Sequence, residues 1–155
     1  MPLLLALLAQ VTPVQPIVHG TGLPPQGTDE ASVMAPVNAL LAGIAAHDGA
    51  AATARVRTDG TLTAAVERAD GSHELRRMSW ADFAARLKPS PQRVEERLLD
   101  PAVEIDGDVA MVWSPYVFLV DGKVDHCGAD HFDVVRDGGS WKLLNVTWSQ
   151  RSTGC

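Results

Sequence analysis

Residues 109–148 decide the fold of this chain: VAMVWSPYVFLVDGKVDHCGADHFDVVRDGGSWKLLNVTW. Asp-Gly pairs interrupt this apolar stretch at 121–122 and 137–138, and another pair stands just before it at 106–107. An Asp-Gly pair between apolar runs predicts a tight hairpin, because both turn residues tolerate positive φ. The spacing therefore predicts a four-stranded antiparallel meander, with strands at about 93–105, 108–120, 123–136 and 141–151.

The residues before the meander predict helices and one smaller hairpin. Ser32 is the expected N-cap of a first helix that ends near His47. A short alanine-rich helix over 49–57 and a hairpin over 61–78 follow, and Ser79 opens a third helix in a pattern that resembles a capping box. The first helix carries apolar residues at helical spacing, namely Val33, Val37, Leu40, Leu41 and Ile44.

Helices followed by a long meander predict an α+β domain, with the helices packed in the concave face of a long, curved, mainly antiparallel sheet that forms a cone-shaped barrel. Strands of about twelve residues twist and bend rather than stay flat. Pairing across the 121–122 turn places Pro115 opposite Gly128, which predicts a bend or bulge at that height. A curved sheet over helices leaves a hollow of the kind that binds small molecules.

Composition narrows the class of protein. The chain has 155 residues, of which 46% are hydrophobic and 21% charged, and its formal net charge is −6. This balance predicts one folded domain rather than a disordered chain. The negative charge argues against a nucleic-acid-binding surface, because phosphate contacts need Lys and Arg. The sequence has no P-loop, GxGxxG turn, GxSxG elbow, HExxH pair or paired CxxC, and no cofactor is expected.

The N-terminal residues predict export. Residues 1–9 form an apolar run that resembles the core of a secretory signal and is too short to span a bilayer, which takes about 20 residues. No basic residue precedes the run, so a plain apolar N-terminus or a misassigned start codon remains the alternative. Residues 10–28 are rich in Pro and Gly and predict a linker, which leaves 29–155 as the folded domain. Export would place the protein in the periplasm or outside the cell.

The two cysteines, Cys127 and Cys155, predict a disulfide. It would close a loop of about 28 residues and contribute about 3 to 4 kcal/mol in the chain-entropy model. Neither cysteine has a CxxC partner, which argues against a structural zinc site. Two free thiols in a cytosolic protein are the alternative, and a disulfide and export support each other.

Three segments resemble the nuclear transport factor 2-like superfamily, whose cystatin-like cones include the SnoaL-like proteins: 37–52, 109–122 and 138–148, the last with the ending G-x-W-K-L-x-x-V. The run 125–128 with the terminal Gly-Cys resembles a group of exported bacterial members of uncharacterised function. The resemblance implies the cone fold and often a dimer through the outer sheet face. It implies no single reaction, because the superfamily holds isomerases, cyclases, dehydratases and non-catalytic binders. Its ketosteroid-isomerase-like members use a tyrosine on the first helix, which this helix lacks.

The run DHCGADH at 125–131 has the composition of a metal site. Successive side chains of a strand point to opposite faces, so His126 and Asp130 share one face while Cys127 and His131 share the other. One ion would reach all four only if a bulge broke the alternation. No metal is therefore expected.

The same alternation assigns an inner face to the meander and a candidate site to that face. The expected ligand-binding residues are Trp113, His126, Asp130, Asn145 and Thr147. A carboxylate in an apolar hollow has a raised pKa and can act as a general acid or base, and a histidine can orient or relay. Asp130 and His126 are thus the catalytic candidates. The apolar residues expected on this inner face are Met111, Val117, Leu119, Phe132, Val134, Trp141 and Leu143.

The opposite face is too apolar to be fully exposed. A homodimer through this outer face would cover it, and a monomer covered by its own tail and linker is the alternative. The residues expected there are Tyr116, Phe118, Val120, Ala129, Val135, Leu144, Val146 and Trp148.

Three functions follow from these expectations. The first is an exported domain that binds a small apolar or mixed-polarity molecule without turnover. The second is an acid–base enzyme of the isomerase, dehydratase or cyclase type that uses Asp130 with His126. The third is a structural or interaction subunit whose own side chains fill the hollow.

Overall fold

The computed structural model describes residues 28–155, so the expected signal segment 1–9 and the expected linker up to residue 27 lie outside the described residues. Thr28 already belongs to the first helix. The elements in chain order are α1 (Thr28–Ala45), α2 (Gly49–Ala52), β1 (Thr61–Glu67), β2 (His73–Ser79), α3 (Trp80–Arg86), β3 (Val94–Leu98), β4 (Ala102–Asp106), β5 (Val109–Val120), β6 (Lys123–Asp137) and β7 (Ser140–Arg151).

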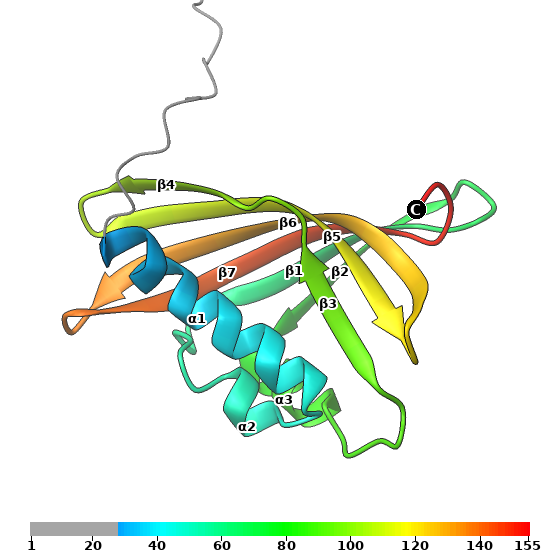
Figure 1. Ribbon diagram of the computed structural model, residues 1–155, viewed down its shortest axis with the longest axis horizontal. Helices are drawn as coiled ribbons and strands as arrows, with labels where there is room; N and C mark the ends of the chain where they lie inside the picture. The colour runs from blue at the N-terminus through cyan, green and yellow to red at the C-terminus, as the bar shows by residue number, and fades with distance from the viewer. Residues whose placement is uncertain (1–27) are drawn as a thin grey trace, which may run out of the picture.

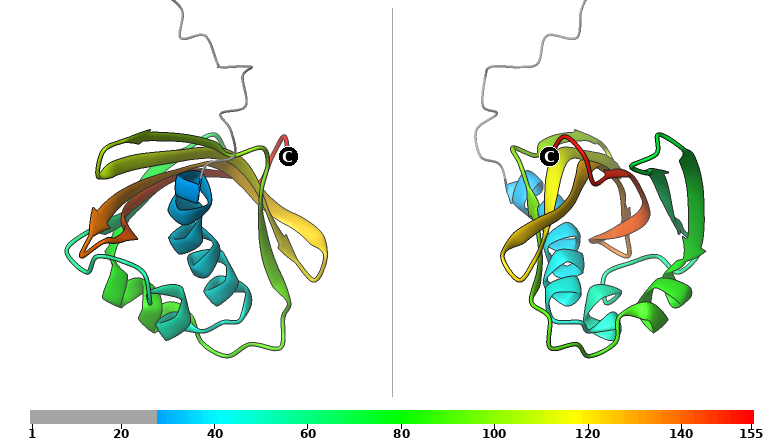
Figure 2. Two further views of the ribbon diagram at one scale, coloured as in Figure 1. Left: turned by 60° about the vertical axis from the view of Figure 1, so that its left-hand side comes forward. Right: turned by 90° about the vertical axis from the view of Figure 1, so that its right-hand side faces the viewer.

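The strands form one mixed sheet in the order β2-β1-β7-β6-β5-β3, with β4 also paired to β5. Only the β1–β7 pair among these strands is parallel; the others are antiparallel. The sheet arches over α1, while α2 and α3 lie toward one end of that helix (Figures 1 and 2). The α+β prediction is confirmed, with the correction that the sheet is curved but does not close into a barrel.

The turns follow the Asp-Gly pairs. Asp121 and Gly122 have φ of 49° and 79°, the left-handed conformation that a two-residue hairpin requires. Asp70 accepts a hydrogen bond from the Ser72 N–H at 2.9 Å in the β1–β2 turn. The predicted hairpins at these two places are confirmed.

The predicted strand 93–105 is two strands, which is a correction. β3 pairs with the second half of β5 and β4 with its first half. The chain turns between them at Asp100, whose φ is 56°, and at Pro101, which has no N–H to donate to a ladder. The buried Ser114 hydroxyl accepts a hydrogen bond from the Leu99 N–H at 3.0 Å and so fixes the break.

The helices differ in their ends from the sequence expectation. α1 begins at Thr28, not at Ser32, and the acidic side chains of Asp29 and Glu30 stabilise its first turn. α2 is only four residues long, and Asp48 caps it by accepting from the Ala51 N–H at 3.0 Å. α3 has the predicted cap, because Ser79 Oγ accepts from the Asp82 N–H at 3.1 Å.

The core lies between the helices and the concave face of the sheet. Trp80 at the start of α3 is buried, and its indole N–H donates to the Leu144 carbonyl of β7 at 3.0 Å. The other buried residues of this core are Val33, Val37, Leu40, Ala52, Leu62, Ala110, Val112, Phe132, Val134, Trp141, Leu143 and Val146.

Two one-residue bulges set which side chains face the core. Asp125 is extra in β6, because Leu119 pairs with Val124 while Phe118 pairs with His126. Tyr116 therefore lies opposite Gly128, and the expected Pro115–Gly128 pairing is wrong by one residue. A one-residue shift moves side chains to the other face, so the even-numbered residues of β5 face inward up to 118.

The second bulge is in β7. Val134 pairs with Leu143 and Asp133 with Asn145, so Leu144 is the extra residue. Val146 is consequently buried and Trp148 packs against the core, whereas Thr147 is exposed. The sequence had placed Val146 and Trp148 outside.

The disulfide joins Cys127 of β6 to the terminal Cys155, with their Cα atoms 5.7 Å apart. It fixes the C-terminal tail against the sheet beside the bulge. This prediction is confirmed.

Candidate functional site

A cavity of about 260 Å³, partly open to solvent, lies between the concave sheet face and the helices. Two apolar residues of α1, Phe83 of α3 and Leu87 directly after α3 cover one side, and five strands supply the rest. Its wall is mostly apolar and rich in aromatic rings. The lining residues are Leu40, Ile44, Leu62, Phe83, Leu87, Glu96, Tyr116, Phe118, His126, Asp130, Phe132, Val146, Trp148 and Gln150.

Asp130 is the most deeply buried charged side chain of the site. It is 4% exposed, lies opposite Ser114 and Trp148, and lines the cavity. Its Oδ2 atom has no hydrogen-bond partner among the described residues. A buried carboxyl oxygen without a hydrogen-bond partner is unfavourable in free energy. We therefore expect this group to hold a proton or to bind a ligand.

Glu96 is a second carboxyl in the same cavity. It is half-buried on β3, where it pairs with Phe118 of β5 and faces inward with it. The sequence analysis missed it because β3 was not assigned a face. The signal was present: Val94, Glu96 and Leu98 alternate on one strand face, and Glu96 is the acidic member of an otherwise apolar set.

Burial raises the pKa of both carboxyls. Loss of hydration, together with the charge of Glu96 and a hydrogen bond to it, raises the pKa of Asp130 to about 9. Loss of hydration raises the pKa of Glu96 to about 7, and the hydrogen bond with Asp130 opposes that rise. Two carboxyls hydrogen-bond to each other only when one is protonated. Between about pH 7 and 9 the pair therefore holds one shared proton.

Tyr116 lies beside this pair. Its hydroxyl donates to the Ser149 carbonyl at 3.0 Å, and its side chain is 2% exposed. Burial and the nearby Asp130 and Glu96 charges raise the pKa of the Tyr116 phenol, which stays neutral. Tyr116 was expected on the outer face; the Asp125 bulge turns it inward.

His126 also lines the cavity. Its ring stacks on Phe118 with centroids 4.6 Å apart, and its Nδ1 is 2.9 Å from Asp125 Oδ2. No hydrogen bond joins His126 to Asp130 in the part of the chain that the structure describes. The two residues share a cavity, as expected, but the neighbour that raises the pKa of Asp130 is Glu96 rather than the histidine.

The other three expected site residues lie away from the cavity. Trp113 is 49% exposed on the outer face, because the Asp125 bulge reverses its side of the sheet. The Leu144 bulge does the same to Thr147, which is exposed. Asn145 is part of the framework instead, since its Oδ1 accepts from the Thr61 N–H at 3.0 Å.

The 125–131 run forms no metal-binding group in the structure. Cys127 is in the disulfide, and residues 28–155 contain no cluster of three or more His, Cys, Asp or Glu side chains. Within the same residues, no helix is both long and apolar enough to cross a membrane.

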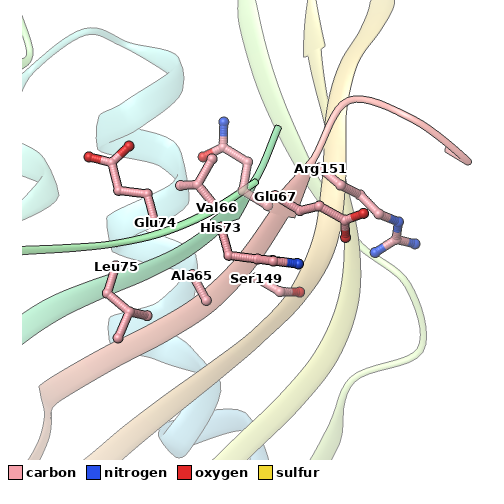
Figure 3. Close-up of a pocket in the computed structure, with 9 residues that line it drawn as sticks. Ala65, Val66, Glu67, His73, Glu74, Leu75, Ser149 and Arg151 are labelled. Atoms are coloured by element: carbon pink, nitrogen blue, oxygen red, sulfur yellow. The ribbon is translucent and has the colours of Figure 1, made fainter. Parts of the chain in front are cut away.

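A second hollow of about 260 Å³ lies where β1 and β7 end and β2 begins (Figure 3). Glu67 pairs with His73 on one side and with Arg151 on the other, and the three side chains lie together. Leu75 beside them is 77% exposed. This hollow contains no buried, unpartnered group among those the structure describes, in contrast to the cavity around Asp130.

No family model and no curated protein matches the chain. Its fold, however, is similar to many solved structures. A nuclear transport factor 2-like protein of unknown function from Shewanella baltica is 12% identical, with 79% of this chain and 94% of that one covered at a TM-score of 0.60. A protein from Streptomyces avermitilis, provisionally named a dehydratase of the same family, is 17% identical, with 80% and 96% covered at 0.62.

A third neighbour is a nuclear transport factor 2-like protein with a cystatin-like fold from Novosphingobium aromaticivorans. It is 15% identical, with 82% of this chain and 84% of that one covered at a TM-score of 0.62. Identities this low show the fold and leave the activity open. The chain therefore has the cystatin-like fold of the nuclear transport factor 2-like proteins.

Proposed function

We propose that the chain binds a small, mainly apolar molecule in the cavity between the helices and the sheet. The observation that supports this proposal most strongly is Asp130, a buried carboxyl on the wall of an aromatic-lined cavity, with one oxygen that has no hydrogen-bond partner. Ligand sites combine an apolar wall with a few polar groups in this way. The volume, about 260 Å³, lies just below the usual range for drug-sized ligands, which favours a small one.

A self-filled hollow is the competing function, and the open volume argues against it. Trp113 and Met111, which were expected on the inner face, lie on the outer face with 49% and 39% of their surface exposed and so do not fill the hollow. The aromatic rings that do face inward line the cavity without closing it.

Two tryptophans provide matched reporters for binding. Trp148 lines the cavity and Trp113 is exposed on the opposite face of the sheet. In a fragment screen by NMR, cavity ligands should shift the indole N–H resonance of Trp148 and leave that of Trp113 unchanged. Ile44→Trp, which fills the cavity from α1, should abolish the shifts, and Leu75→Trp on the exposed β2 surface should not. Fragments that shift neither resonance, or both equally, would refute the proposal.

Acid–base catalysis is the second candidate function, and the shared proton of Asp130 and Glu96 favours it. Between about pH 7 and 9 the pair holds one proton and one negative charge, so it can donate a proton to a bound molecule and accept one from it. The provisional dehydratase name of the Streptomyces avermitilis neighbour is compatible with this chemistry. His126 would then orient the ligand rather than relay protons to Asp130.

Proton exchange tests this second function without knowledge of the substrate. A small ketone that binds in the cavity should exchange its α-hydrogens with D2O faster in the presence of the protein. Asp130→Asn and Glu96→Gln should each remove the acceleration while binding persists. A ketone that binds without accelerated exchange would leave the chain a binding protein.

Export and dimerisation belong to the same proposal. The disulfide is compatible with a location outside the cytoplasm, where thiols are oxidised. Exposed Met111 and Trp113 on the outer sheet face would be covered in a homodimer.

A further inference from the structure

The charges around the cavity are unbalanced. Glu96 and Asp130 are both carboxyls, and no Lys or Arg is among the lining residues that the structure describes. Arg151, whose charge acts on the Tyr116 phenol, lines the second hollow and not this cavity. The described part of the wall thus has no positive charge that would stabilise the ionised form of both carboxyls.

Aromatic side chains line the same cavity as these carboxyls. Tyr116, Phe118 and His126 form a connected group, with the His126 ring 5.8 Å from that of Tyr116 and 4.6 Å from that of Phe118. The remaining aromatic lining residues are Phe83, Phe132 and Trp148. An aromatic ring attracts a cation through its negative face, and the attraction strengthens where water is excluded.

From this combination we infer that the ligand of the cavity is a small organic cation, an ammonium group on a compact apolar body. This inference rests on the proposed binding function and specifies its ligand class. The ammonium donates hydrogen bonds to the unpartnered Asp130 Oδ2 and to the Glu96 carboxylate, and the apolar body contacts Leu40, Phe83 and the aromatic rings. Binding expels the proton that the carboxyl pair shares, so the cation replaces it and one proton goes to solvent.

Benzylamine and benzyl alcohol are suitable probes, because they share shape and differ in charge. Isothermal titration calorimetry of the full chain at pH 7.5, in two buffers of different ionisation enthalpy, measures both affinity and proton release. Benzylamine should bind about 10-fold or more tightly than benzyl alcohol, which is the effect of a charge-assisted hydrogen bond. Up to one proton should be released for each amine bound.

Variants assign the effect to the pair. Asp130→Asn and Glu96→Gln should each remove the preference for the amine and the proton release. Asp133→Asn is the matched control, because Asp133 is on the same strand with its side chain 41% exposed on the other face. If Asp130→Asn does not fold, Glu96→Gln and the pH dependence of the native protein still decide the question.

The pH dependence must separate the carboxyls from the other titratable groups that line the cavity. These are Tyr116 and His126; the helices contribute only apolar side chains. Amine affinity should rise from pH 5.5 to 8 as the pair loses protons, and the rise should persist in His126→Gln.

Benzyl alcohol that binds as tightly as benzylamine, or amine binding unchanged by Asp130→Asn and Glu96→Gln, would overturn the cation inference while leaving small-molecule binding intact. No binding of either probe at millimolar concentration would also overturn it, and the NMR fragment screen then tests the binding function separately.

Discussion

Asp130 and Glu96 determine the chemistry of the cavity at the scale of single residues. Burial keeps both acids partly neutral. The charge of Glu96 raises the pKa of Asp130 further, whereas the hydrogen bond with Asp130 lowers the pKa of Glu96. The unfolded chain, in contrast, ionises both near pH 4. The folded protein therefore binds more protons than the unfolded chain at neutral pH.

The first prediction follows from this difference in protonation. A carboxyl with a raised folded-state pKa stabilises the fold most below its unfolded pKa and loses that contribution as the pH rises through the folded value. The free energy of unfolding should fall between about pH 4 and 9, by up to about 1.4 kcal/mol per pH unit for each proton. Asp130→Asn should flatten this fall, as measured by urea denaturation across the range. A native protein whose stability rises over the same range would contradict the pKa assignment.

Gly128 is the second residue on which the site depends. A Cβ atom at this position would collide with the Ser149 backbone carbonyl, so only glycine lets β7 approach β6 here. Gly128 stands between His126 and Asp130, two residues that line the cavity.

We accordingly predict that Gly128→Ala is destabilising. Backbone must shift to accept the methyl group, at a cost of about 1 to 3 kcal/mol by analogy with overpacked cores. Thermal unfolding followed by circular dichroism measures this loss. An unchanged melting temperature would show that β6 and β7 are farther apart than the structure has them.

The sequence identified half of the carboxyl pair. Asp130 was found because Phe132 and Val134 alternate with it on an apolar face. Glu96 carried the same signal between Val94 and Leu98, but the strand was read as a single long one whose face was not assigned. Proximity between residues 96 and 130 depends on β3 pairing with β5, which local patterns do not reveal.

At the scale of elements, two bulges decide the content of the cavity. Asp125 and Leu144 are each an extra residue relative to the paired strand. Each changes which side chains beyond it face the core. The expected positions of Trp113, Tyr116 and Thr147 were wrong for this reason. The Pro115–Gly128 signal indicated an irregularity close to the right place, but the residue that bulges depends on packing across three strands.

The tail is the second element that matters, because the disulfide holds it against β6. Cys155→Ser with Cys127→Ser should lower the free energy of unfolding by about 3 to 4 kcal/mol, the chain-entropy value for a loop of this length. Urea denaturation of the native protein, with and without reductant, measures the same difference independently. Equal stability of the oxidised and reduced forms would mean that the crosslink does not constrain the unfolded chain.

At the scale of the whole molecule, residues 28–155 form a curved sheet with helices on its concave side and none of their helices on the other (Figure 2). This arrangement was predictable, because hairpin spacing, helix periodicity and the order of elements all indicated the same α+β layers. The parallel β1–β7 pair was not predicted, since it joins strands that are distant in sequence and no turn specifies it. That pair completes the sheet and brings α3 beneath it through Trp80.

Dimerisation is the prediction at this scale. Met111 and Trp113 are exposed on the uncovered sheet face, so we expect a homodimer that buries them. Trp113→Glu should convert it to a monomer in analytical ultracentrifugation. Leu99→Glu is the control, because Leu99 is 47% exposed in the connection between β3 and β4 rather than on that face. A native protein that sediments as a monomer at all concentrations would refute the dimer and leave the cavity unaffected.

The most direct measurement is a pH titration of the side-chain carboxyl carbons by 13C NMR. If Asp130 and Glu96 share a proton in a desolvated cavity, the Asp130 signal should remain that of a protonated acid at pH 7 and titrate near pH 9, with Glu96 titrating near pH 7. Two carboxyls that both titrate near pH 4, as hydrated ones do, would contradict the account.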